Sequence, residues 1–247
     1  MLTLVAALIQ VASARQVLIE LGKKYSVEIQ VASGDFAWQG DGYKVEGHAP
    51  PADELERYVA LFASEWNRYP REVIPATKLK RIVIASNISL DSQARAAVPA
   101  FDGQTMFYDT TLGRANPLYQ RSVIHHEFFH YIDNLQGHMR VDPEWAALNP
   151  IGFRYGSGGD KMRVKGAGSL TDNLPGLLTP YAGSGVEEDK AELFSHLLTT
   201  PEYVERRMAS DPVLCSKVAL LKGRLVKWNG AFDEAFWASR ALVPAIR

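Results

Sequence analysis

The order of apolar and polar positions in the first half of the chain predicts several strands. Residues 25–33 (YSVEIQVAS) alternate between apolar and polar side chains, which is the period of a half-buried strand. Residues 34–51 carry closely spaced glycine, aspartate and proline, which predict a hairpin and a loop. The apolar run at 79–88 (LKRIVIASNI) predicts a strong strand, and the shorter run at 103–111 (GQTMFYDTT) predicts another.

Two segments of the same half have apolar residues three to four positions apart, which predicts helices. Residues 52–70 have Asp53 as the expected N-cap, an acidic first turn and Pro70 at the expected end. Residues 117–136 carry an apolar stripe at helical spacing, and Gly137 is the expected stop. We therefore expect the second of these helices to follow directly after the last predicted strand.

The second half of the chain changes from irregular to helical. Residues 137–185 are rich in glycine and proline, which predicts a long irregular segment with a mobile loop at 156–169. From Glu187 onward the helical spacing returns and continues almost to the C-terminus. No internal repeat or low-complexity tract is present in the sequence.

The first 24 residues allow two interpretations. An apolar run ends in the small residues Ala12–Ala14, as in a signal peptide, but the segment lacks a positively charged start. The alternative is an amphipathic N-terminal helix that continues through residues 15–25. The apolar run is too short to predict a stable membrane span. The pattern favours export to the periplasm or medium slightly over a cytoplasmic location.

Composition narrows the class of protein. The 247 residues are 47% hydrophobic and 22% charged, which suits one large domain over residues 25–247. The net charge of −1 gives no overall field for a nucleic acid or an acidic membrane, so no nucleic-acid partner is expected. A single cysteine, Cys215, excludes an intramolecular disulfide and a zinc site with several cysteines. We expect Cys215 to be a buried apolar residue.

The clearest chemical signal is the stretch HHEFFH at residues 125–130. His126 and His130 are four positions apart and lie on one face of a helix, with Glu127 directly after the first. In this H-E-x-x-H arrangement two imidazoles converge on a zinc ion, and the glutamate handles a metal-bound water. His125 points about 100° away from that face, so we expect it to pack or to support a ligand.

A catalytic zinc site usually has a third protein ligand, and the candidates are His125, His138, His196 and several carboxylates. The metzincin pattern places a histidine six residues after His130, but Gln136 occupies that position, which disfavours this class. The stretch GVEEDKAELFSHLL at 185–198 puts Glu188 and Glu192 on one helical face, so that one can bind the metal and the other support a ligand histidine. The alternative is an acidic helix start that complements the helix dipole, which explains Glu192 less well than Glu188.

Two motifs together resemble the gluzincin zinc metallopeptidases. HEFFHYID at 126–133 matches H-E-x-x-H-x-x-D, and EDKAELF at 188–194 matches E-x-x-A-E-x-F. Over roughly residues 100–200 the chain resembles the catalytic domain of anthrax lethal factor and the bacterial zinc-binding metallopeptidases related to it. The resemblance implies an α+β, zincin-like fold, in which a small twisted mixed sheet lies over an active-site helix. It also implies a helical C-terminal lobe that supplies the last ligand.

The same resemblance implies a role for each matching residue. The implied roles are His126, His130 and Glu188 as zinc ligands, Glu127 as general base, Tyr181 as donor to the oxyanion, and Glu192 and Asp133 as supports of the ligands. The active-site helix is expected at about 117–136 and the third-ligand helix at about 187–199. The implied activity is hydrolysis of a protein or peptide substrate by a metal-activated water, with Zn²⁺ as cofactor.

Alternatives to these roles remain open at the level of sequence. Tyr181 could pack against a neighbouring surface with its hydroxyl in water. The protein could bind zinc without catalysis, or be an interaction protein with a degenerate zincin fold. A closed structural zinc site is disfavoured because no cysteine lies near the motif. By analogy of fold, the strand at 103–111 is expected to be the sheet edge that aligns a substrate.

Overall fold

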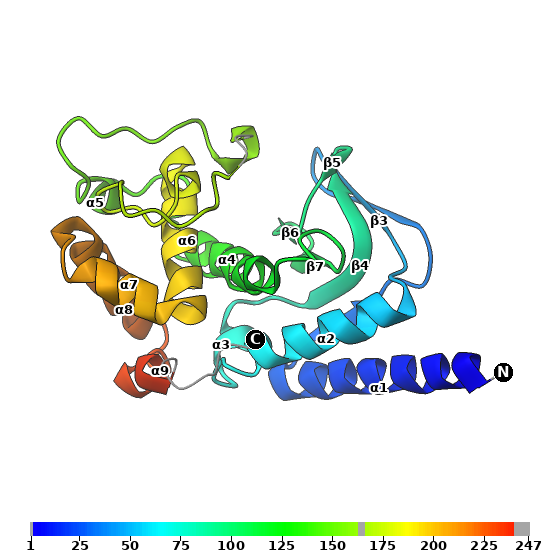
Figure 1. Cartoon of the computed structure of the whole chain (residues 1–247). Helices are drawn as coiled ribbons and strands as arrows, with labels where there is room; N and C mark the ends of the chain where they lie inside the picture. The colour runs from blue at the N-terminus through cyan, green and yellow to red at the C-terminus, as the bar shows by residue number, and fades with distance from the viewer. Residues whose placement is uncertain (1, 163–165, 240–247) are drawn as a thin grey trace. The chain divides into compact units, whose positions relative to one another are not determined.

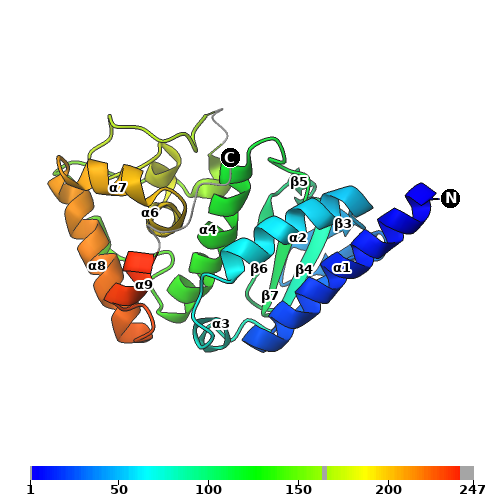
Figure 2. The same ribbon diagram turned by 60° about the horizontal axis from the view of Figure 1, so that its bottom comes forward.

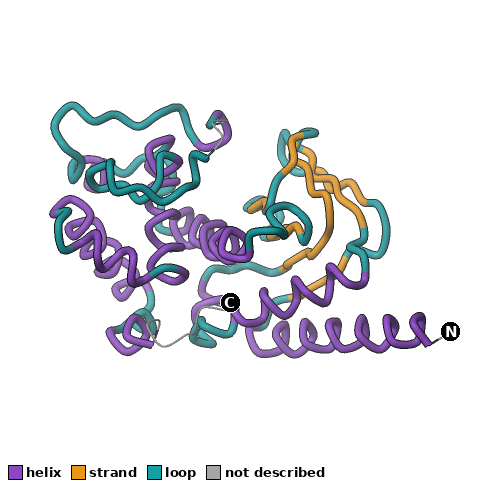
Figure 3. The backbone as a smooth tube through the Cα atoms, viewed as in Figure 1, coloured by secondary structure: helices purple, strands orange, loops and turns teal. Residues whose placement is uncertain are grey.

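The computed structural model describes residues 2–162 and 166–239. It divides into two compact units, Met1–Tyr131 and Ile132–Arg247. Figure 1 labels the elements, and Figure 3 shows that the strands of the described part belong to the first unit, whereas the second consists of helices and loops. The single catalytic domain expected for 25–247 stays a prediction.

The first unit is built around a mixed sheet. Its strands are β1 (Glu28–Val31), β2 (Phe36–Gln39), β3 (Lys44–His48), β4 (Arg81–Leu90), β5 (Gln93–Ala94), β6 (Ala97–Ala100) and β7 (Thr105–Asp109). The main path of the sheet is β2-β3-β4-β7-β6, and β1 and β5 also pair with β4. The long strand β4 organises the sheet, because it pairs in parallel with β1 and β7 and antiparallel with β3.

The observed strands confirm most of the predicted ones and correct one expectation. The predicted hairpin is present as the antiparallel pair of β2 and β3. The strand β6 was not predicted, because it has only four residues and contains Pro99. It pairs with β7 on the side opposite β4, so β7 is an interior strand. The expectation that residues 103–111 form the sheet edge is therefore wrong, and β6 ends the sheet path on that side.

The helices α1 (Leu2–Tyr25) and α2 (Ala52–Trp66) lie on one face of this sheet (Figure 2). The short α3 (Val73–Ala76) follows α2 in sequence, and α4 (Pro117–Leu135) follows β7, with its last turn in the second unit. Figure 2 shows α1 and α2 side by side across the strands. The alternation of β4 explains this layer, because Ile82 and Ile84 are fully buried while Arg81 and Val83 are partly exposed.

Two details of these helices differ from or add to the sequence analysis. The helix α2 begins at Ala52 after Pro51, so Asp53 lies inside its first turn and is not the N-cap. Its carboxylate there still complements the helix dipole. Residues 2–25 are helical, and the signal-peptide interpretation of this segment stays a prediction. None of the helices in the described part is long and apolar enough to cross a membrane.

The second unit is arranged around α6 (Val186–Thr199). The other elements of this unit are α5 (Pro143–Ala146), η1 (Gly159–Lys161), η2 (Tyr181–Ser184), α7 (Pro201–Met208), α8 (Pro212–Trp228) and α9 (Glu234–Ala238). Every residue of α6 except Glu187 is buried. Because that buried set includes acids, a lysine and a histidine, their polar groups require partners inside the protein.

The exposure of the single cysteine differs from the expectation. Cys215 is exposed on α8 rather than buried. The helix buries Leu214, Val218, Leu221 and Leu225, which recur at helical spacing, so the neighbouring position 215 faces solvent.

Candidate metal centre

A buried polar cluster on one face of α4 attaches this helix to α2. His125 is fully buried, with Nε2 2.8 Å from Glu65 and Nδ1 2.6 Å from the hydroxyl of Tyr69. Because a carboxylate only accepts hydrogen bonds, we assign the proton to Nε2, so that Nδ1 accepts from Tyr69. His125 thus packs against α2 and the turn that follows it, as the sequence predicted.

Charges stabilise this cluster despite its burial. Arg121 and Arg68 bind the two oxygens of Glu65 at 2.6 and 2.7 Å. Burial by itself would raise the pKa of Glu65, but the hydrogen bond from His125 and both arginines outweigh it and hold the pKa at about 2. Burial lowers the pKa of His125, so its ring is neutral at pH 7. The cluster therefore ties α2 to α4 and sets the rotation of α4 about its axis.

His126 and His130 share the next face of the same helix. Both are buried, their Nε2 atoms lie 3.2 Å apart, and their ring planes cross at 84°. Two ligands about 2.05 Å from a tetrahedral zinc ion lie about 3.3 Å from each other. The pair therefore already has the spacing that two nitrogen ligands of one metal ion require. Glu127, between them in sequence, is only partly buried.

The first turn of α6 carries the acidic candidate. Glu188, Asp189 and Lys190 are all buried. The carboxylate of Asp189 accepts from Lys217 at 2.6 Å, and it also accepts from the Trp145 indole at 2.9 Å and the Tyr155 hydroxyl at 2.5 Å. Burial raises the pKa of Asp189 and lowers that of Lys217, so the pair depends on these contacts to remain charged.

Tyr181 and Glu188 meet at Gly159. A Cβ atom placed on Gly159 would overlap both the Tyr181 hydroxyl and the Glu188 carboxylate. The glycine-rich loop is held there by its backbone, because the Gly158 N–H donates to the Ser184 carbonyl at 2.7 Å. The tyrosine predicted from the resemblance therefore lies close to the predicted glutamate. Gly159 itself was not singled out in the sequence, where it is one of several glycines.

The predicted supporting residues have partners within the second unit. Glu192 accepts from the Thr179 hydroxyl at 2.7 Å and lies 3.8 Å from His196 Nε2. Asp133, in the last turn of α4, binds the ammonium of Lys190 at 2.8 Å. Support of a ligand histidine by either carboxylate stays a prediction. Thr179 and Lys190 were missed, because nothing near them in sequence indicates their partners.

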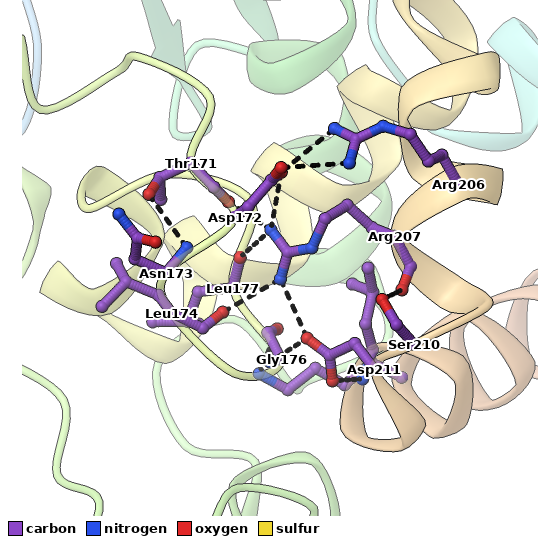
Figure 4. Close-up of polar contacts among 12 residues, drawn as sticks. Thr171, Asp172, Asn173, Leu174, Gly176, Leu177, Arg206, Arg207, Ser210 and Asp211 are labelled. Carbon is purple, nitrogen blue, oxygen red and sulfur yellow. Dashed lines mark hydrogen bonds and ion pairs between the residues drawn. The ribbon is translucent and has the colours of Figure 1, made fainter.

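A buried arginine fixes the segment that leads to Tyr181 (Figure 4). Arg207 donates to three backbone carbonyls and to Asp211, which lies 2.9 Å away. The carbonyls belong to Thr171, Leu174 and Leu177. Asp211 in turn accepts from the backbone N–H groups of Leu214 at 3.0 Å and Gly176 at 2.7 Å. Burial by itself would raise the pKa of Asp211, but these two contacts and Arg207 hold it down. The chain thus enters the turn of Tyr181 from a fixed position.

Among the described residues, His126, His130 and Glu188 are buried side chains of the types that bind metal ions. Two imidazoles and one carboxylate are a donor set that suits a transition-metal ion. The donor chemistry and the 3.2 Å spacing of the two imidazole nitrogens therefore fit a bound metal ion.

No family model matches this chain, and no curated protein does. Among solved structures, it is similar to a protein from Bacteroides caccae described as a "putative zinc-binding metallo-peptidase". The TM-score is 0.60, the sequence identity is 20%, and the match covers 93% of this chain and 91% of that chain. At this identity the similarity establishes architecture. The protein has an α+β, zincin-like metallopeptidase fold, with a small mixed sheet and several helices.

Proposed function

We propose that the protein is a zinc-dependent metallopeptidase. The observation that carries the proposal is the H-E-x-x-H helix, whose two imidazole nitrogens lie at the spacing of zinc ligands with a partly exposed carboxylate beside them. The similarity in fold to the Bacteroides caccae protein described as a "putative zinc-binding metallo-peptidase" supports it. The closer resemblance to the lethal factor catalytic domain stays a prediction.

Glu188 is the third ligand in this proposal. The helix α4 is continuous, and Asp133 follows His130 by about one helical turn. Lys190, two residues after Glu188, binds Asp133 at 2.8 Å. The helix that carries Glu188 is therefore attached to the last turn of the helix that carries both histidines. Glu188 is buried, and a carboxylate oxygen is a donor that zinc accepts beside two imidazoles.

The chemistry proposed for the chain's own groups is hydrolysis of a peptide bond. Zinc, when bound, acts as a Lewis acid that lowers the pKa of a coordinated water towards about 7. Glu127 accepts a proton from the attacking water and then delivers it to the leaving amine. Because a tyrosine hydroxyl carries a proton that it can donate, Tyr181 can give a hydrogen bond to the developing oxyanion.

The test combines metal content with hydrolysis. The purified protein should contain about one zinc per chain, and His126→Ala and His130→Ala should lose it, because each removes a ligand. Glu127→Gln should keep zinc and the fold but lose cleavage of denatured casein or of a peptide library. Full zinc content in both histidine variants, measured by elemental analysis, would rule out this site. Zinc binding without cleavage of any peptide would favour the non-catalytic alternative.

A further inference from the structure

Lys190 is a buried lysine whose three N–H groups all have acceptors. Its side chain is 1% exposed. The ammonium lies 2.8 Å from Asp133, 2.6 Å from the carbonyl oxygen of His138 and 3.2 Å from Asp142. A buried ammonium that lacked any one of these partners would be costly, so the three contacts define one position for the side chain.

The groups around Lys190 are themselves fixed. Asp142 accepts two hydrogen bonds from Arg224, at 2.6 and 3.0 Å, and one from the backbone N–H of Trp145 at 3.0 Å. Burial by itself would raise the pKa of Asp142, but Arg224, Trp145 and Lys190 hold it at about 2. Arg224 also binds Glu144 at 2.5 Å, so three carboxylates surround the two cations. The paired charges of this network hold the Lys190 ammonium in one position.

This anchor holds the end of the histidine helix in two ways. Lys190 binds the side chain of Asp133, which follows His130 by about one turn. It also binds the carbonyl of His138, whose N–H donates to the Asp133 carbonyl at 3.2 Å. Gly137 between them has φ +74°, the left-handed conformation that ends a helix in this manner. Side chain and backbone of this helix end thus converge on one ammonium.

We propose that Lys190 is a positioning residue for the metal ligands, because it fixes the helix of Glu188 against the last turn of the helix that carries His130. The inference rests on the proposed function, in which Glu188 is a ligand. Lys190 acts through Asp133 and the helix end, without contact to substrate. Since ligand geometry depends on such outer contacts, losing one typically weakens metal affinity by about 10- to 100-fold.

A second buried lysine offers a matched control. Lys217 binds Asp189 at 2.6 Å, and Asp189 lies directly after Glu188 on α6. Lys217 is on α8, and in the described part of the chain it forms no hydrogen bond or ion pair with α4; it also binds Asn149 and the Gly176 carbonyl. Removing either lysine leaves one buried carboxylate uncompensated near the start of α6. The two variants therefore share the loss of stability but differ in the link to the histidine helix.

The experiment compares Lys190→Met with Lys217→Met in the full chain. Both should lower the melting temperature of the metal-free protein. Lys190→Met should also weaken zinc affinity about 10- to 100-fold, measured by competition with a chromophoric chelator. It should shift the visible absorption bands of the Co²⁺-substituted protein, which report ligand geometry. Lys217→Met should keep the wild-type spectrum and an affinity within about threefold.

A double variant separates positioning from stability. Lys190→Met with Asp133→Asn removes both charges, so it should regain melting temperature without regaining affinity or the wild-type Co²⁺ spectrum. It also carries the test if Lys190→Met alone does not fold. Wild-type affinity and spectrum in the Lys190 variants overturn the inference, and so do equal losses in Lys217→Met. A wild-type protein that binds no zinc overturns the proposed function itself.

Discussion

Gly159 has no side chain at the point where the Tyr181 hydroxyl and the Glu188 carboxylate meet. We expect Gly159→Ala to weaken zinc affinity by about 10-fold or more, because the new methyl group can be accommodated only by moving the Glu188 carboxylate or the Tyr181 ring. The fold should persist, since the overlapping atoms are tips of side chains. Competition with a chelator measures the affinity, and thermal unfolding of the metal-free protein checks the fold.

Gly168→Ala is the control for this change. Gly168 lies in the same long segment, is exposed, and has open space where a Cβ atom would be. Its substitution should leave zinc affinity as in the wild type. Equal affinity in Gly159→Ala and Gly168→Ala would mean that Glu188 does not bind the metal from its present position.

Tyr181→Phe tests the hydroxyl alone. If the hydroxyl donates to the oxyanion, its loss should lower kcat by about 10²- to 10³-fold, because one such donor stabilises the transition state by about 3 to 4 kcal/mol. Zinc content, KM and melting temperature should change little. Tyr203→Phe is a suitable control, since its hydroxyl bonds Asp172 on the surface. Intact turnover with a lower melting temperature would show that Tyr181 only packs.

Residues close in sequence were predictable and residues distant in sequence were not. The helical period alone places His126 and His130 together and turns His125 away, and both features are observed. Lys190 looks like an ordinary lysine in an acidic helix, because its partner Asp133 lies 57 positions away. The need for a glycine at position 159 likewise arises from Tyr181 and Glu188, which lie beside it only in the folded chain.

At the scale of elements, the contacts of Glu65 that link α2 to α4 should stabilise the fold less at acidic pH. Glu65 has a folded pKa of about 2 against a usual value of 4.5, so it stabilises the folded state above about pH 4.5. This contribution is lost as pH falls from about 4.5 to 2, because the unfolded chain then takes up the proton more readily. The difference corresponds to a free energy of unfolding on the order of 3 kcal/mol.

Glu65→Gln measures this contribution directly. Its free energy of unfolding, from urea titration, should be lower than that of the wild type at pH 7 by a few kcal/mol. The difference in free energy of unfolding should shrink as pH is lowered through 4 and 3, since Glu65 of the unfolded wild-type chain then becomes protonated and its ionised native form stabilises the fold less. Glu28→Gln provides the comparison, because Glu28 forms an exposed ion pair with Arg81 and should contribute little. If the difference in free energy of unfolding between the wild type and Glu65→Gln stays constant with pH, Glu65 acts through packing and not through its charge.

The elements that sequence reasoning missed are those with weak local signals. The strand β6 has four residues and a proline, and its pairing with β7 defines it more than its own pattern does. The start of α2 differs from the predicted one, because Pro51 takes the N-cap position without a side-chain hydrogen bond and Asp53 lies inside the helix. The helix α6 is buried on almost all sides, and its acids Asp189 and Glu192 bind Lys217 and Thr179, two partners that the sequence did not indicate.

At the scale of the whole molecule, the motifs carried more information than overall similarity. No family model matches the chain, and the similar solved structure shares 20% identity with it. The two motifs nevertheless indicated a zincin-like fold, because the chemistry of a metal site restricts residue types at a few fixed spacings. The remaining positions only have to fill a core, which many sequences can do. Sheet order and the path of residues 137–185 were therefore beyond prediction.

Removal of the metal ion should lower the thermal stability of the whole molecule. A metal ion that binds only the folded chain stabilises it by RT ln(1 + [L]/Kd), about 4 kcal/mol at free zinc 1,000-fold above Kd. For a chain of this length, 1 kcal/mol shifts the melting temperature by about 2–4 °C, so a chelator should lower it by about 8–16 °C. Glu127→Gln should keep this shift, because it retains the proposed ligands. His126→Ala should melt at the same temperature with and without zinc. A zinc-dependent shift that persists in His126→Ala would place the stabilising metal ion at another site.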